Sequence, residues 1–158
     1  MCIRKLRKAQ ESDLMTLFQW VNDKECRKNF FHSEIISLEE HTKWFQKKLA
    51  DNESSIYILC EKEVPVGQIR LDITKNQADI SYSIASEFRG KGYGKLILLL
   101  VEEEVKKERP EIEILAGKVK FDNIPSQRKF EQMQYEKSET ADYVYFQKKI
   151  QNAEGNKE

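Results

Sequence analysis

The chain has 158 residues, in which 27 lysines and arginines balance 27 aspartates and glutamates, so its formal net charge is zero. This balance argues against a general electrostatic attraction to nucleic acid or to an anionic membrane and leaves room only for a local basic patch. No apolar run approaches the length of a membrane span, and the first residues lack the apolar stretch of a signal peptide.

The first third of the chain is predicted to hold one strand and two helices. Residues 3–8 alternate in polarity and predict an edge strand, after which Ser12 or Asp13 is expected to cap a helix. Residues 22–36 read as a polar and aromatic connection, and Ser37 opens a capping box for the second helix. Three residues of that helix are expected to face inward: Trp44, Phe45 and Leu49.

The rest of the chain is predicted to be richer in strands. The elements in chain order are strands over 56–61, 66–73 and 78–85, a helix over 94–108, a strand over 112–119, a helix over 126–132 and a strand over 143–150. One further strand is expected near Tyr135. No repeat or linker divides the sequence, so we expect a single domain over residues 1–150 and a polar tail over 151–158.

The most informative segment is Arg89-Gly90-Lys91-Gly92-Tyr93-Gly94, which joins a strand directly to an apolar helix. Glycines at every second position let successive backbone N–H groups point into one concavity. The helix that follows adds unpaired N–H groups and the positive end of its dipole. The segment therefore predicts a binding site for a pyrophosphate.

Spacing excludes two common nucleotide motifs. A dinucleotide-binding fingerprint needs a glycine where this chain has Lys95, and a P-loop needs Ser or Thr directly after that lysine. The remaining pattern is Arg-x-x-Gly-x-Gly, formed by Arg89, Gly92 and Gly94. This pattern, with its strand before and helix after, resembles the acetyl-CoA loop of the GNAT acetyltransferase superfamily. The alternative is a glycine-rich turn with a solvated basic rim.

The resemblance extends over most of the chain, because the predicted element order is that of the GNAT fold. It implies an α/β (α+β) protein with a mixed, mostly antiparallel sheet of six or seven strands and about four helices. The sheet is expected to splay in the middle, where the strand that feeds the loop leaves the next parallel strand.

The resemblance also implies acetyl-CoA as the acetyl donor and assigns its contacts. The pyrophosphate would be bound by the backbone N–H groups of Gly90, Gly92, Gly94 and Lys95. Arg89 and Lys91 would add positive charge, and Tyr93 lies within the same loop. The pantetheine arm would extend the sheet along Ser83–Ala85, so that the N–H of Ile84 meets the thioester oxygen. The alternative interpretation of Ile84 is an ordinary core residue, and both roles can hold because its side chain packs while its amide is free to bind.

A second family segment is Asn123-Ile124-Pro125-Ser126, in which Asn123 and Ser126 would contact the CoA arm. Taken alone, this segment is a helix-capping turn. The family often places a tyrosine four residues later to protonate the leaving thiolate, but this chain has Phe130, and Gln134-Tyr135 replaces the usual Gly-Phe. The identity of a general acid is therefore open, although a CoA thiol with a pKa of about 8.5 can depart unassisted.

Several residues are candidates for the general base. His32 has a suitable ordinary pKa of about 6.5 and lies in a loop that is expected to border the substrate. Ser81 replaces a common glycine and could relay a proton through water. Further carboxylate candidates are Asp79, Asp72 and Glu34. For each of these residues, an ordinary surface or hydrogen-bonding role is the competing interpretation.

The N-terminal third resembles the GNAT branch that acetylates the 4-amino group of nucleotide-linked deoxyaminosugars, as in pseudaminic-acid pathways. Its members read Trp-Arg-Asn, a following Arg and Glu-His-x-x-Trp-Phe, whereas this chain has Val21 in place of the first Arg. The expected acceptor contacts are Trp20, Asn22, Arg27, His32, His41 and Trp44. Of these, Arg27 and His41 would bind a diphosphate, and Trp20 or Trp44 would stack on a base or sugar.

Other functions stay open at this point. Ribosomal-protein N-terminal acetyltransferases share a looser form of the same N-terminal pattern, and a polyamine acceptor would favour an acidic pocket of Glu34, Glu39 and Glu40. A CoA-binding module without turnover is the non-enzyme alternative. Widely spaced Cys2, Cys26 and Cys60 predict neither disulfides nor a metal site. We therefore expect a cytoplasmic monomer or homodimer that binds a small-molecule amine and neither nucleic acid nor membrane.

Overall fold

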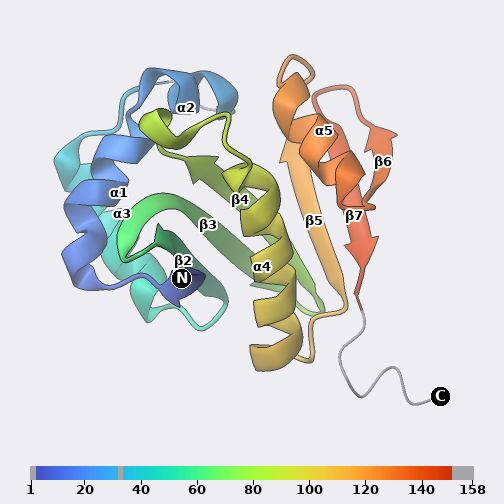
Figure 1. Cartoon of the computed structure of the whole chain (residues 1–158), viewed down its shortest axis with the longest axis horizontal. Coiled ribbons are helices and arrows are strands. Elements are labelled where there is room, and N and C mark those ends of the chain that lie inside the picture. The colour runs from blue at the N-terminus through green and yellow to red at the C-terminus, as the bar shows by residue number, and fades with distance from the viewer. Residues whose placement is uncertain (1–2, 32–33, 151–158) are drawn as a thin grey trace.

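A computed structural model describes residues 3–31 and 34–150, so the predicted tail and His32 lie outside the described residues. Its centre is a seven-stranded sheet in the order β1-β2-β3-β4-β5-β7-β6 (Figure 1). The strands are β1 (Arg4–Lys8), β2 (Ser54–Glu61), β3 (Val64–Thr74), β4 (Gln77–Ile84), β5 (Ile114–Val119), β6 (Glu136–Glu139) and β7 (Val144–Lys149). All neighbouring pairs are antiparallel except β4 and β5.

Within the described residues, five α-helices and two short 3-10 helices connect the strands. The α-helices are α1 (Leu14–Val21), α2 (Lys24–Asn29), α3 (Leu38–Ala50), α4 (Tyr93–Glu108) and α5 (Ile124–Gln132), and the 3-10 helices are η1 (Glu11–Asp13) and η2 (Ser86–Phe88). The sequence prediction of a mixed, mostly antiparallel sheet with helices on both faces is confirmed, including a further strand after Tyr135, which is β6.

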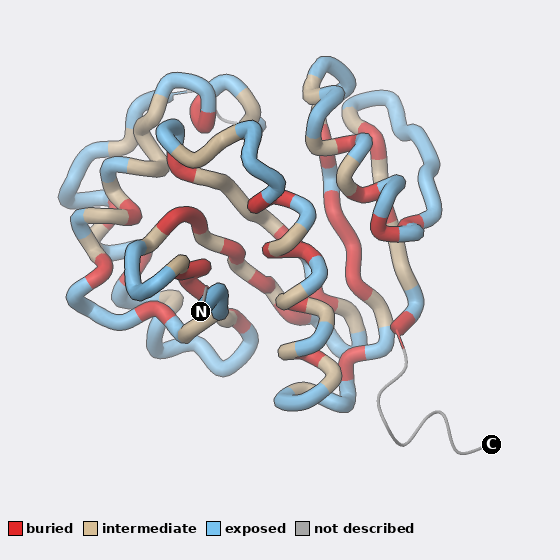
Figure 2. Tube along the Cα trace, in the orientation of Figure 1, coloured by how far each residue is buried: buried red, intermediate tan, exposed pale blue. Residues whose placement is uncertain are grey.

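Both faces of the sheet carry apolar side chains, because successive residues of a strand point to opposite faces. In β2, Tyr57 and Leu59 belong to the larger core cluster, which also contains Leu98 of α4. Ile58 of the same strand points to the opposite face and packs with Phe45 of α3. Helix α4 thus covers one face and α1 with α3 the other, and buried residues follow the central strands and α4 (Figure 2).

The parallel strands β4 and β5 pair over only part of their length. Their register runs from Gln77 opposite Ile114 to Ile80 opposite Gly117, and the remainder of each strand is unpaired with the other. Figure 1 shows the two arrows diverging beyond this point. The predicted splay in the middle of the sheet is therefore present, at the end of β4 that leads into the glycine loop.

Several local predictions were wrong. Residues 22–36 contain α2, a short helix that Asp23 caps by accepting a hydrogen bond from the Cys26 N–H. Of the three residues of α3 that were expected to face inward, only Phe45 is buried, whereas Trp44 is 36% and Leu49 37% exposed. Asp13 makes no side-chain cap for α1, because its carboxylate is bound by Arg7 instead.

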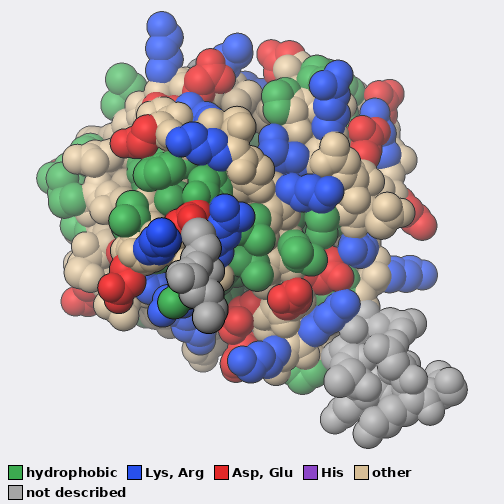
Figure 3. All heavy atoms as spheres, viewed as in Figure 1, with side chains coloured by type: hydrophobic (Ala, Val, Ile, Leu, Met, Phe, Trp, Pro, Cys, Tyr) green, Lys and Arg blue, Asp and Glu red, His purple; other side chains and the backbone are tan. Residues whose placement is uncertain are grey.

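The surface fits the balanced composition. On the face that carries α4, lysine and arginine side chains are interspersed with acidic ones (Figure 3). Within residues 3–31 and 34–150, no helix is both long and apolar enough to cross a membrane.

Candidate active site

The glycine loop turns into α4 through left-handed backbone. Gly90 has φ of 76° and Gly92, the N-cap residue of α4, has φ of 87°, values that side chains with a Cβ rarely adopt. The first backbone bond of the helix runs from the Leu96 N–H to the Gly92 carbonyl at 3.2 Å. The loop therefore enters the helix without a capping side chain over its N-terminus.

This arrangement leaves a set of donors facing outward at the helix start. In the described part of the chain, no protein acceptor meets the backbone N–H groups of Gly90, Gly92, Gly94 and Lys95. Such a set, with the positive end of a 16-residue helix behind it, favours the binding of an anion. The side chains of Lys91 and Lys95 are exposed beside it.

Arg89 braces this loop. Its Nε donates to the Ile84 carbonyl at 3.0 Å and its Nη2 to the Asp23 carboxylate at 2.7 Å, which ties the end of β4 to the cap of α2. Burial alone would raise the pKa of the Asp23 carboxyl, but the Arg89 guanidinium and local backbone N–H groups outweigh it and hold that pKa below its usual value. Arg89 is thus a fixed part of the loop, in addition to its positive charge.

The splay exposes backbone groups of β4. In the antiparallel β3–β4 pair, Ala85 donates to the Val66 carbonyl at 2.8 Å, so the alternate residues Tyr82 and Ile84 turn their backbone groups away from β3. They face the gap left by β5, because the β4–β5 pairing has ended by Ile80. The Ile84 carbonyl is taken by Arg89, and its N–H points into the splay.

The side chains of β4 divide between the two faces of the sheet. Tyr82 and Ile84 pack against the core cluster under α4. Ser81 and Ser83 face the side of α3, where Ser83 accepts a hydrogen bond from Gln68 Nε2 at 3.1 Å. The splay therefore connects the α4 face with the α3 face.

One cavity of about 1100 Å³ joins these features. Its wall includes the loop glycines Gly90, Gly92 and Gly94, the free edges of β4 and β5, and aromatic residues of α1 and α3. The volume exceeds that of most small-ligand sites, so the cavity has room for more than one ligand.

The second family segment also lies at this cavity. Asn123 caps α5 by accepting from the Ser126 N–H at 3.4 Å, and the Ser126 hydroxyl is 3.0 Å from the Tyr82 hydroxyl across the splay. Burial raises the pKa of Tyr82 to about 12, so this phenol stays protonated at neutral pH. Phe130, at the position where the family often has tyrosine, is buried and stacks at 5.0 Å on Phe146.

Not every predicted acceptor residue is free to bind a ligand. Trp20 and Trp44 line the cavity. Asn22 does not, because its side chain is bonded in both directions to the backbone of Ile36, at 2.8 Å each way. Val21 lies in the wall at the position where the resemblance expects an arginine.

Arg27 and His41 are largely enclosed. Arg27 is 7% exposed, its Nη1 donates to the Glu34 carbonyl at 2.6 Å, and its guanidinium lies 4.7 Å from the ring of Phe30. His41 is 2% exposed, with Nε2 at 3.1 Å from the Leu14 carbonyl. Burial lowers the pKa of His41 despite that carbonyl, so the ring is neutral at neutral pH and offers no positive charge to a diphosphate.

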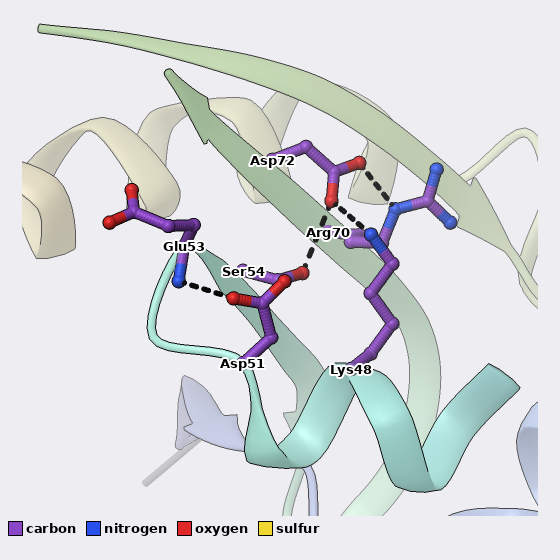
Figure 4. A network of polar contacts seen from close by, with 6 residues as sticks. All are labelled: Lys48, Asp51, Glu53, Ser54, Arg70 and Asp72. Atoms are coloured by element: carbon purple, nitrogen blue, oxygen red, sulfur yellow. Dashed lines mark hydrogen bonds and ion pairs between the residues drawn. The ribbon is translucent and has the colours of Figure 1, made fainter. Parts of the chain in front are cut away.

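The carboxylates that are candidates for the general base differ in how they are bonded. Asp72 is bound by Lys48, Ser54 and Arg70 and is therefore not a free base (Figure 4). Asp79 lines the cavity and accepts from Gln77 at 2.9 Å. In the described part of the chain, no group of three or more His, Cys, Asp or Glu side chains could hold a metal ion.

Sequence reasoning missed Arg70, which lines the cavity on the α3 face. The available signal was the alternation of β3, which places Gln68, Arg70 and Asp72 on the face opposite the buried Ile69 and Leu71. That signal alone does not reveal that the position lies against Trp44.

Comparisons with known proteins agree with this architecture. The family model described as "Acetyltransferase (GNAT) domain" matches residues 4–136. The chain therefore belongs to the GNAT acetyltransferase family, whose members are acyl-transferring enzymes. No curated protein matches the sequence.

Solved structures share the fold. A spermidine N-acetyltransferase from Vibrio cholerae, in complex with CoA and spermine, superposes with a TM-score of 0.85 at 15% identity, over 92% of this chain and 95% of that one. RimL, a ribosomal L7/L12 alpha-N-protein acetyltransferase in complex with CoA, gives 0.80 at 18% identity, over 93% and 94%. The aminoglycoside acetyltransferase AAC(6')-Ib with CoA and kanamycin gives 0.82 at 19%, over 99% and 100%. At such identities the likeness shows the fold alone.

Proposed function

We propose that this acetyltransferase moves the acetyl group of acetyl-CoA to the primary amine of a small molecule, the 4-amino group of a nucleotide-linked aminosugar. The observation that carries the proposal is the continuous cavity from the amide-lined loop, through the splay, to the aromatic wall of α1 and α3. Solved relatives of the same fold were obtained with CoA, which supports this donor.

The donor half of the site follows from the backbone. The amides of Gly90, Gly92, Gly94 and Lys95 bind the diphosphate, and the N-terminus of α4 adds its dipole. The free edge of β4 over Ser83–Ala85 bonds the amides of the pantetheine arm as an added strand would. Asn123 and Ser126 line the opposite wall of the same passage.

The chemistry needs an oxyanion donor and a route for the proton that the amine loses. The Ile84 N–H polarises the thioester carbonyl while the amine nitrogen attacks its carbon, and such a donor is worth about 3–4 kcal/mol in the transition state. The carbon–sulfur bond then breaks and the thiolate leaves with the electron pair. Ser81, on the acceptor face, relays the amine proton through water to a base, and His32, which lies outside the described residues, is the candidate for that base.

For the acceptor, aromatic surface supports a sugar or base. Trp20 and Trp44 lie in the cavity wall, where indole faces stack on such rings. A polyamine is the second candidate because four carboxylates line the cavity besides Asp72, which is paired with Lys48 and Arg70: Glu25, Glu34, Glu40 and Asp79. Glu39 is excluded from this set, since it pairs with Lys43 at 3.2 Å on the exposed side of α3.

An acceptor panel tests the proposal. Thiol release from acetyl-CoA would be followed with a UDP-linked 4-amino-4,6-dideoxyhexose, spermidine, kanamycin and a peptide with a free N-terminus. We expect the nucleotide sugar to give the highest kcat/KM by at least about tenfold. Preferred acetylation of spermidine would replace the proposal with the polyamine candidate.

A further inference from the structure

A polar network on the acceptor face fixes the orientation of Arg70 (Figure 4). The Asp72 carboxylate accepts from Lys48 Nζ at 2.7 Å, from Ser54 Oγ at 3.2 Å and from Arg70 Nε at 2.9 Å. Burial would raise the pKa of Asp72, but Lys48 and Arg70 outweigh it and hold that pKa below its usual value. One carboxylate therefore faces two cations, and the group of three carries a net positive charge.

The Arg70 guanidinium is fixed in position, but its terminal nitrogens have no hydrogen-bond partner among the described residues. Its guanidinium carbon lies 5.2 Å from the centre of the Trp44 ring, which adds a cation–π contact. Only Nε is bonded to another described residue, and Figure 4 shows both terminal nitrogens pointing away from Asp72. A rigid guanidinium with two unbonded donors suits the two oxygens of a phosphate or carboxylate.

The strand register places this group close to the point of acetyl transfer. Arg70 pairs with Ser81, and two positions along β3 Gln68 pairs with Ser83 beside Ile84. Two residues of a strand span about 7 Å, roughly the length of one sugar ring. An acceptor with its amine at the splay can thus place an anionic group on Arg70. Asp79 pairs with Asp72 and lies farther from the splay than Arg70 does.

We propose that Arg70, held by Asp72 and stacked on Trp44, binds an oxyanion of the acceptor and so selects acceptors that carry a phosphate. The same donors would fit a carboxylate, which the test below distinguishes. The choice of phosphate rests on the proposed function, whereas the oxyanion site itself rests on the geometry of Arg70 alone.

The first test measures binding without catalysis. UDP is titrated calorimetrically into protein saturated with CoA, so that the pyrophosphate site at α4 is already filled, and uridine serves as the neutral ligand. Arg70→Gln should weaken UDP binding about 10- to 100-fold, because charge-assisted hydrogen bonds are lost, and leave the affinity for CoA unchanged. Arg109→Gln, which removes an arginine paired with Glu111 outside the cavity, is the matched control and should leave both affinities unchanged. Equal UDP affinity in wild type and Arg70→Gln would overturn the proposal.

The second test uses turnover. With the UDP-linked aminosugar, Arg70→Gln should raise KM about 10- to 100-fold with little change in kcat, and with the neutral methyl glycoside of the same sugar it should change neither. Arg70→Lys keeps the positive charge but loses the planar pair of donors, so its KM for the UDP-linked aminosugar should lie between those of wild type and Arg70→Gln. An equal loss of kcat with both acceptors would show a structural role and contradict oxyanion binding.

The outcomes separate this inference from the proposed function. Glutarate is titrated beside UDP under the same conditions. If glutarate binds in an Arg70-dependent way and UDP does not, the oxyanion site stands and the nucleotide-sugar acceptor is wrong. If wild-type protein binds neither probe, the oxyanion site itself is refuted, whatever amine is acetylated. A melting temperature for each variant, close to that of wild type, shows that loss of the Asp72 bond has not unfolded the site.

Discussion

At the scale of single residues, the glycines of the site serve two different physical needs. A Cβ at Gly90 or Gly92 would meet nothing within 4 Å, but both residues have positive φ, so the backbone conformation requires glycine there. A Cβ at Gly117 would lie 2.6 Å from the Phe130 ring, so the requirement there is space. The first need shapes the anion site, and the second sets how closely α5 packs on β5.

Gly92→Val should abolish CoA binding and leave most of the fold intact. A β-branched residue at φ of 87° costs about 1–3 kcal/mol or moves the loop, and it places methyl groups among the anion-binding amides. Calorimetric titration with CoA measures the loss. Lys75→Val, at a positive φ in the turn between β3 and β4, is the control for backbone strain and should bind CoA normally. Unchanged affinity in Gly92→Val would remove this loop from the binding site.

Gly117→Ala should destabilise the protein by about 1–3 kcal/mol, because the new methyl group overlaps a buried aromatic ring. Chemical denaturation gives the change in the free energy of unfolding. Gly94→Ala is the matched variant, since its Cβ would meet the flexible Lys129 side chain at 2.5 Å and that chain can swing aside. A Gly117→Ala protein as stable as Gly94→Ala would mean that Phe130 is less tightly held than its contacts indicate.

At the scale of elements, β1 is tied to the start of α1 by a partly buried ion pair. Arg7 donates two hydrogen bonds to Asp13, at 2.8 and 2.9 Å, and Asp13 also accepts from the Gln10 N–H at 2.8 Å. The hydrogen bond from Arg7 lowers the pKa of Asp13 most strongly, against the effect of burial. The folded state therefore favours the ionised carboxylate.

This pair predicts a pH dependence of stability. The pKa of Asp13 is lower in the folded protein than its value of about 3.9 in the unfolded chain. The ion pair therefore contributes its full stabilisation above that unfolded pKa, and this stabilisation is lost as the pH falls toward the folded pKa. Asp13→Asn should cost about 1–3 kcal/mol at pH 7 and flatten the acid limb of the stability curve. Unfolding free energies measured from pH 7 to pH 3 test this, and parallel curves for the two proteins would exclude Asp13 as a source of the acid limb.

The element order and the loop could be predicted from the sequence because both are encoded locally. Alternation marks β4, and the glycine spacing marks the turn into α4. Helix α2 could not be predicted from the sequence, because a polar segment of six residues is too short to show an apolar periodicity. The exposure of Trp44 and its contact with Arg70 depend on how α3 crosses β3, which no local pattern contains.

At the scale of the whole molecule, the sheet separates the two halves of the site. The amide-lined loop opens at the start of α4, while Arg70 and Ser81 lie on the face covered by α3. A group can pass from one face to the other where β4 and β5 part, beyond Ile80. The splay is therefore the feature on which both the proposed donor site and the proposed acceptor site depend.

The most direct test of this account is amide hydrogen exchange, followed by NMR with and without CoA. We predict that CoA slows the exchange of the Ile84 amide and of the loop amides at Gly90, Gly92, Gly94 and Lys95, and leaves the turn at Lys75 unaffected. Binding of CoA without protection at these amides, or with protection confined to another surface, would contradict the account.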